Sequence, residues 1–447
     1  MLTDNAIRTI KDDQYGFEPF ARLLADTIRE TDDLPFTLGI FGEWGCGKSS
    51  LMNMIRDDLG TSPHVKTIAF NPWKYDNKEE LWNALIQTIL YGIAEEAEKN
   101  NKKEVLEKAT NLAKTAAWLA LKKGMSALTA GVVSGKDLEK IKNSLFAQDK
   151  LHYQHINTFE ESFEEVVKLY TGDGKLVVFI DDLDRCMPEN AITVLESLKL
   201  FIGHASCVFV LGMDRHIIEQ GIKLRFGDRI EMSGRDYLDK IIQAPFFIPP
   251  VPFAKLRESL QVAKTAQYSD TVWKIIEYGL RGNPRRTKRF VNSFFLLNQI
   301  LKSPEVLNAP GGEPQQPLFG THEEQHYYLA KLLIFQLVFN RFYTHLELNP
   351  EAWSDLEDKI IDADGKPSNN VINAMPEIQK IWDASELFQL FMTQTTLHSS
   401  PGGILPPPDE EVVSSLMKAI NLVSRSDTQE QKITQQVQAP SGSYTQE

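Results

Sequence analysis

The residues with the clearest chemical signature form one glycine-rich run, Gly42-Glu43-Trp44-Gly45-Cys46-Gly47-Lys48-Ser49-Ser50. It contains the pattern G-x-x-x-x-G-K-[ST], in which glycines let backbone N–H groups wrap around a phosphate. A helix that begins at the end of the run would direct its positive N-terminal end at the same anion. Lys48 is expected to reach the β- and γ-phosphates of a nucleotide, and the Ser49 hydroxyl to bind Mg²⁺. The whole run is therefore predicted to contact a nucleoside triphosphate.

A pair of acids supplies the metal-binding partner that such a loop needs. The apolar run Leu176–Ile180 is followed directly by Asp181 and Asp182. Asp181, at the carboxyl end of the predicted strand, is the expected Mg²⁺ ligand. Asp182 is placed to orient or deprotonate an attacking water molecule. Loop and acids together predict hydrolysis of a nucleotide.

Two further candidates stay open between alternatives. Asp214 follows an apolar run, and its position suits either a sensor of the terminal phosphate or the N-cap of the next helix. The segment Arg281–Arg289 packs five positive charges into nine residues, and Arg285 is the candidate for contact with the terminal phosphate. The same cluster would also suit a solvated helix N-terminus or a nucleic-acid-binding patch.

Short apolar runs must position these residues, and such runs are typical of strands buried on both faces of a parallel sheet. They are Phe36–Phe41, Val65–Phe70, Leu176–Ile180, Cys207–Leu211 and Phe246–Ile248. Amphipathic stretches between them predict helices. This alternation predicts an open, mostly parallel α/β sheet.

The rest of the chain is predicted to be helical. Residues 76–165 are far longer than a connecting loop, so we expect a helical insertion. Its most apolar stretch, Ala116–Val133, is interrupted by lysines and too short for a membrane span, although contact with a membrane surface stays open. A helical lid is expected over 255–305, which would complete a domain at 1–310. A helical region at 320–425 and a disordered tail at 426–447 would follow.

Composition excludes several classes of protein. The chain has 447 residues, with 48 Lys and Arg against 61 Asp and Glu, which gives a net charge of −13. This acidity argues against a general nucleic-acid coat. Three scattered cysteines predict neither a disulfide framework nor a zinc site. No signal peptide is evident, so we expect a cytoplasmic protein, with peripheral membrane association left open.

Six motifs in order resemble the KAP family of P-loop NTPases. They are GEWGCGKSS at 42–50, FNPWKY at 70–75, FIDDLDR at 179–185, VLGMDR at 210–215, YLDKIIQ at 237–243 and GNPR at 282–285. The resemblance implies a five-stranded sheet of order 5-1-4-3-2. It also implies that Asp181 and Asp182 are the metal and catalytic acids, Asp214 a sensor and Arg285 a lid arginine.

The resemblance also sets the functional expectation. ATP and Mg²⁺ are the expected ligands, because no N-K-x-D motif for guanine follows the third strand. The chain is expected to be an ATP-hydrolysing switch in bacterial anti-phage defence or signalling. The alternative is a nucleotide-gated module that binds protein or nucleic acid with little hydrolysis. A protein partner or self-assembly is expected through the C-terminal helices, and integral membrane insertion is not.

Trp44 and Trp73 are predicted to pack against the loop rather than stack on a base.

Overall fold

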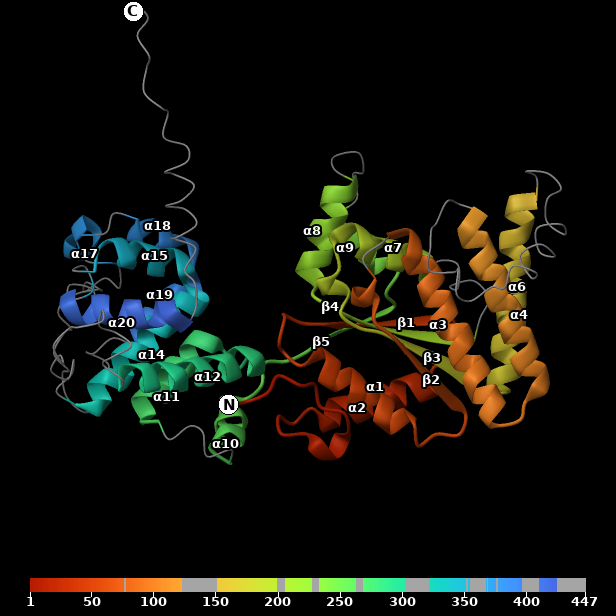
Figure 1. Cartoon of the computed structure of the whole chain (residues 1–447), viewed down its shortest axis with the longest axis horizontal. Coiled ribbons are helices and arrows are strands. Elements are labelled where there is room, and N and C mark those ends of the chain that lie inside the picture. The colour runs from red at the N-terminus through yellow and green to blue at the C-terminus, as the bar shows by residue number, and fades with distance from the viewer. Residues whose placement is uncertain are drawn as a thin grey trace, which may run out of the picture. The chain divides into compact units, whose positions relative to one another are not determined.

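The computed structural model contains one five-stranded sheet. It describes residues 1–75, 78–122, 151–198, 206–226, 233–262, 268–302, 321–350, 353, 367, 369–374, 377–395 and 410–423. The strands are β1 (Phe36–Phe41), β2 (Val65–Phe70), β3 (Lys175–Ile180), β4 (Cys207–Met213) and β5 (Ala244–Phe247). All pairs are parallel and the order is β2-β3-β4-β1-β5 (Figure 1). The predicted α/β class and sheet order are confirmed.

The strand register brings the candidate residues to one edge of the sheet. Phe41 pairs with Met213, and Ile180 pairs with Phe70 on one side and Leu211 on the other. Because parallel strands end at the same edge, the residues that follow these strands are neighbours. The glycine-rich loop (Gly42–Ser50) and Asp181 both start there.

Helices cover both faces of the sheet. One face carries α1 (Glu18–Glu30) and α2 (Lys48–Leu59), and the other carries α3 (Lys78–Lys99), α7 (Pro188–Leu198), α8 (Arg215–Phe226) and α9 (Gly234–Asp239) (Figure 1). Alternate residues of β3, Leu176, Val178 and Ile180, belong to the apolar core of the second face. Val177 and Phe179 point to the opposite face and are also buried. Burial on both faces explains why these strands read as continuous apolar runs.

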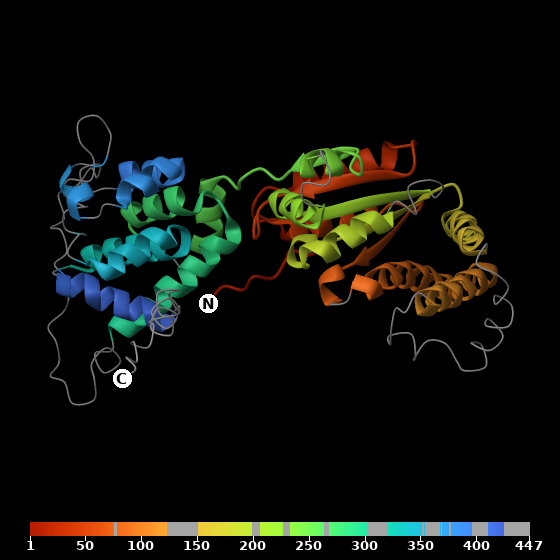
Figure 2. The same cartoon turned by 90° about the horizontal axis from the view of Figure 1, so that it is seen from above.

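The insertion consists of helices that extend the second face. It includes α3, α4 (Lys103–Lys122) and α6 (Leu151–Thr171), which lie side by side (Figures 1 and 2). Part of the apolar stretch Ala116–Val133 lies beyond Lys122 and outside the described residues. Among the helices that the structure describes, none is both long and apolar enough to cross a membrane.

The chain divides into two compact units. The sheet unit is Asn5–Pro249, and the helical unit is Met1–Asp4 together with Pro250–Glu447. The helices of the helical unit are α10 (Phe253–Val262), α11 (Asp270–Leu280), α12 (Pro284–Leu301), α14 (His322–Val338), α15 (Asn340–Leu348), α17 (Asn369–Ala374), α18 (Ile378–Ala384), α19 (Glu386–Thr395) and α20 (Glu410–Val423). The expected lid at 255–305 therefore packs with the C-terminal helices, whereas the expected tail at 426–447 lies outside the described residues.

Packing inside the helical unit is tight between α11 and α14. A Cβ added at Gly279 would lie 2.7 Å from Ile334 Cγ2, so the two helices approach closely at this glycine. Burial of Trp273, Phe290 and Phe335 supplies a large part of the apolar core.

The N-terminal segment, residues 1–9, is divided between the units, with Met1–Asp4 in the helical unit and the rest in the sheet unit. Leu2 and Asn292 of α12 exchange two hydrogen bonds, Leu2 N–H to Oδ1 (2.7 Å) and Nδ2 to Leu2 O (2.9 Å). Further along, Ile7 N–H donates to Ser50 Oγ (3.1 Å) and Ile7 O accepts from Asn53 Nδ2 (3.0 Å). The segment is thus fixed to α12 at one end and to α2 at the other.

Candidate functional site

The glycine-rich loop joins β1 to α2, and its backbone requires glycine at two points. Gly45 and Gly47 have φ angles of 86° and 113°, a region that other residues rarely adopt. A Cβ at Gly47 would also lie 2.6 Å from the Phe17 ring. Gly47 immediately precedes Lys48, the first residue of α2, so the loop leads into a helix N-terminus. This is the strand-loop-helix arrangement that the sequence predicts for a phosphate-binding loop.

Lys48 is buried and fully engaged by its own surroundings. Its Nζ donates to Gly42 O (2.8 Å) and Glu43 O (3.2 Å), and it lies 2.9 Å from Asp184 Oδ2. The Lys48 and Asp184 side chains are 7% and 2% exposed. The two carbonyl oxygens accept two of the three ammonium hydrogens, and the Asp184 carboxylate balances the charge as an ion pair. Sequence reasoning left Asp184 without a role.

Asp181 and Ser49 meet where a metal ion would bind. The Ser49 side chain hydrogen-bonds to Asp181, and Asp181 Oδ1 accepts the Asp182 N–H (2.8 Å). Burial raises the pKa of the Asp181 carboxyl, although the Ser49 hydrogen bond opposes the shift. The structure thus brings together the two predicted Mg²⁺ ligands.

The donor set fits Mg²⁺. Ser49 and Asp181 offer hard oxygen ligands, and the buried Asp184 Oδ1 has no hydrogen-bond partner in the described part of the chain. Within the same part of the chain, no group of three His, Cys, Asp or Glu residues is suited to hold a metal ion. That agrees with Mg²⁺, which commonly uses one or two carboxylates together with substrate phosphates and water.

Asp182 is held from two sides. Its backbone is left-handed, with φ 60° and ψ 30°, a conformation that Asp tolerates better than most residues. Asn71 Nδ2 donates to Asp182 Oδ2 (2.8 Å), and Arg185 Nε lies 2.7 Å from Asp182 Oδ1. Sequence reasoning missed Asn71, for which the available signal was a polar residue directly after a buried strand.

The two candidates that sequence left open lie in different units. Asp214 follows β4 in the sheet unit, and its Oδ1 accepts the His216 N–H (3.0 Å), so the expected helix-cap contact is present. Arg285 belongs to the helical unit, where its Nε lies 3.5 Å from Asp4 Oδ2. Lys288 of the same basic cluster donates to Thr3 O (3.2 Å). Part of the cluster therefore binds the N-terminal segment.

Four side chains in and beside the loop have contacts or exposures of their own. The Trp44 and Trp73 residues are 48% and 54% exposed, and the Trp73 ring lies against the Arg185 guanidinium. Burial raises the pKa of the Cys46 thiol, which keeps it in the neutral form. Ser50 Oγ accepts the Ile7 N–H, which leaves its backbone N–H as the group available to a phosphate.

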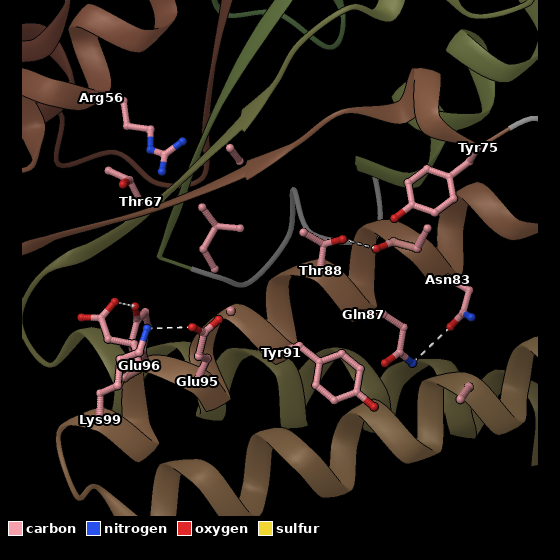
Figure 3. Close-up of a pocket in the computed structure, with 16 residues that line it drawn as sticks. Arg56, Thr67, Tyr75, Asn83, Gln87, Thr88, Tyr91, Glu95, Glu96 and Lys99 are labelled. Atoms are coloured by element: carbon pink, nitrogen blue, oxygen red, sulfur yellow. Dashed lines mark hydrogen bonds and ion pairs between the residues drawn. The ribbon is translucent and has the colours of Figure 1, made fainter. Parts of the chain in front are cut away.

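A second cavity, of about 920 Å³, lies between β2 and α3, away from the loop (Figure 3). Tyr91 and Gln87 of α3 are among its lining residues. Its acids are already paired, since Glu96 lies 2.6 Å from Lys66 and Glu95 lies 2.7 Å from Lys99. No residue of the glycine-rich loop lines it, so it is distinct from the nucleotide site.

Together, a parallel sheet, a glycine-rich loop after β1 and acids after β3 define a P-loop nucleotide-binding domain. The KAP family P-loop domain matches residues 17–301. The chain belongs to the KAP family of P-loop NTPases.

Two sequence relatives extend this comparison. The phage T7 exclusion protein of Escherichia coli strain K12 is 26% identical over 285 residues, which cover 59% of this chain and 37% of that protein. The chain thus spans little more than a third of that relative. The uncharacterized protein MJ0182 of Methanocaldococcus jannaschii is 26% identical over 160 residues, 30% of this chain and 82% of that protein.

Two solved structures are similar at low scores. A Walker-type ATPase of Pyrococcus abyssi aligns with a TM-score of 0.36 and 12% identity, over 92% of this chain and 98% of that chain. The ORC2 protein of Aeropyrum pernix, in ADPNP and ADP complexes, aligns with a TM-score of 0.33 and 13% identity, over 94% and 96%. At these scores neither likeness bears on the activity of this chain.

Proposed function

We propose that this protein is a Mg²⁺-dependent ATPase that uses nucleotide binding and hydrolysis to switch conformation or assembly. The observation that carries the proposal is the grouping of Lys48, Asp181 and Asp182 at one edge of the sheet. These residues provide a phosphate ligand, a metal ligand and a group that orients water. Asp182 follows the metal ligand directly, as a hydrolytic site requires.

Each side chain has a role in this proposal. The loop backbone and the N-terminus of α2 bind the phosphates, and Lys48 exchanges a present partner for a phosphate oxygen. Ser49 and Asp181 hold Mg²⁺, which when bound neutralises charge on the β- and γ-phosphates. Asp182 orients the attacking water and accepts its proton. The roles of Asp214 as a sensor and of Arg285 as a ligand of the terminal phosphate remain proposals of the same kind.

Phosphate release provides the test. Wild-type protein should hydrolyse ATP with Mg²⁺, and Lys48→Ala and Asp182→Asn should both abolish turnover. Asp182→Asn should still bind ATP, because Asp182 is not a phosphate ligand. Asp173→Asn, an exposed change outside the site, is the control. Wild-type activity no higher than that of the two site variants would contradict the proposal.

We further propose that the protein acts in the bacterial cytoplasm in defence against phage. The support is the name of one relative, a phage T7 exclusion protein, which matches over part of its length. Plaque counts on bacteria expressing the wild-type protein should be lower than on bacteria expressing Lys48→Ala. Equal counts for a panel of phages would contradict a nucleotide-dependent defence role.

A second candidate is a nucleotide-gated binding module with little hydrolysis. It is supported by Asp182, both of whose carboxylate oxygens are engaged by neighbouring side chains. Partner capture by the C-terminal helices should then be equal in wild-type protein and Asp182→Asn, but lost in Lys48→Ala. A truncation near residue 310 is a poor test, because it would expose the face of α11 that packs on Ile334.

A further inference from the structure

Asp182 belongs to a closed ring of side-chain contacts. Arg185 lies 2.7 Å from Asp182 Oδ1, and its guanidinium also lies over the Trp73 ring, 5.1 Å from the centroid. The Trp73 backbone N–H donates to Asn71 Oδ1 (3.0 Å), and Asn71 Nδ2 donates to Asp182 Oδ2 (2.8 Å). Both carboxylate oxygens of Asp182 are therefore fixed by residues from two different strand ends.

The ring orients each member. The Asn71 amide oxygen is occupied by Trp73 N–H, which leaves only its NH₂ group to face Asp182. The Arg185 guanidinium lies over the Trp73 ring, a contact worth about 0.5–1 kcal/mol at exposed sites. The Asp182 and Arg185 side chains are 14% and 27% exposed, so water still reaches the carboxylate.

We propose that Asn71 and Arg185 are positioning residues that hold the Asp182 carboxylate in the orientation needed to activate water. This inference rests on the proposed ATPase function. A carboxylate has about four lone-pair positions, and the one hydrogen bond in the ring that reaches Asp182, from Asn71 Nδ2, uses one of them, which leaves positions for water. Catalysis by a group of this kind depends on its placement, because a displacement of about 1 Å can cost roughly 100-fold in rate.

A purely structural role for Asn71 is the competing explanation, because Asn71 Oδ1 also caps the short turn Pro72–Lys74. The variant Asn71→Asp separates the two roles. It keeps an oxygen for the Trp73 N–H, but it replaces the donor that faces Asp182 by a second carboxylate. The variant therefore removes the hydrogen bond that orients Asp182 and places a repelling charge beside it.

The experiment measures kcat and KM for ATP in full-length wild-type, Asn71→Asp and Arg185→Gln proteins. We expect kcat to fall about tenfold or more in both variants, with KM changed by less than about threefold. Arg185→Lys should recover part of the activity, because it keeps the charge. Asn111→Asp, an exposed change on α4, is the matched control and should equal the wild type.

An unchanged or increased kcat in Asn71→Asp would overturn the positioning role. So would a reduced kcat with a lower unfolding temperature and no recovery of activity in Arg185→Lys, because this pattern means structural damage. Absence of turnover in wild-type protein would overturn both this inference and the proposed function. Wild-type turnover above that of Lys48→Ala, with a normal Asn71→Asp, would overturn the inference alone.

Discussion

Lys48 and Asp184 form an ion pair that is almost completely buried. Removing one partner of such a pair leaves an uncompensated charge, at a cost of about 3–5 kcal/mol. We expect Asp184→Asn to lower the unfolding temperature of the nucleotide-free protein. ATP should then stabilise the variant more than the wild type, because phosphate replaces the lost carboxylate. Thermal unfolding with and without ATP, in a metal chelator, measures both effects.

Asp173→Asn is the matched control for this comparison, because Asp173 is exposed in a turn. It should show the wild-type response to ATP. An equal ATP-induced shift in Asp184→Asn and the wild type would mean that Asp184 does not compete with phosphate for Lys48.

The Asp181 carboxyl gives a pH dependence with a defined sign. Burial raises its pKa, and Mg²⁺ binds only its ionised form. We expect the Mg²⁺-dependent part of ATP affinity to weaken on acidification at a pH above the ordinary range of Asp, about 3.9. Calorimetric titration with ATP, with and without Mg²⁺, measures this effect. The same titration of Asp181→Asn corrects for protonation of ATP itself.

The raised pKa of Asp181 also affects the free energy of unfolding. A raised pKa means that the carboxyl favours folding while it is protonated, and that this contribution is lost as pH rises through the folded pKa. Asp181→Asn should therefore unfold at a higher temperature than wild-type protein at neutral pH, without nucleotide. The difference should shrink on acidification. A lower unfolding temperature for the variant at neutral pH would contradict this sign.

Lys48 and Asp181 could be predicted from the sequence, whereas the contacts of Asn71 and Asp184 could not, because those contacts depend on the tertiary fold. Lys48 and Asp181 each follow a buried strand, so local pattern was sufficient to place them. Asn71 and Asp182 are 111 residues apart, and only the order of β2 and β3 brings them together. Asp184 sits in the same run as the predicted acids, but its contact with Lys48 depends on the tertiary fold.

At the scale of elements, strands were predicted better than helix ends. All five strands lie within a few residues of the predicted runs. For β1, β3 and β4 the reason is burial on both faces, which leaves few polar positions. The helical lid expected over 255–305 is interrupted between α11 and α12 by Arg281 and Gly282, whose φ angles are 47° and 70°. Amphipathic periodicity continues across this break, so the only local signal was Gly-Asn-Pro. A second break, at Phe339, carries no helix-breaking residue.

The close approach of α11 and α14 is itself testable. Gly279→Leu would force a side chain against Ile334, and such overpacking typically costs about 1–3 kcal/mol. We expect a lower unfolding temperature for the helical unit and unchanged affinity for ATP. Ala384→Leu, at an exposed position of α18, is the control and should leave both quantities unchanged. A normal unfolding temperature in Gly279→Leu would contradict the packing.

At the scale of the whole molecule, two compact units share one chain. We expect calorimetric unfolding to depart from a single two-state transition, because each unit has its own apolar core. ATP with Mg²⁺ at about 100 times its Kd should stabilise the sheet unit by about 2.7 kcal/mol. ATP should therefore raise the temperature of the unfolding transition of the sheet unit and leave that of the helical unit unchanged. A single transition that shifts as a whole would contradict independent unfolding of the units.

The N-terminal segment has a consequence for synthesis of the chain on the ribosome. Leu2 is made 290 residues before its hydrogen-bond partner Asn292. At about 5–20 residues per second, that delay is roughly 15–60 s. The sheet unit is a continuous stretch of chain, and all its strands are made before α12 appears. Leu2 therefore waits for its partner while the whole sheet unit is made.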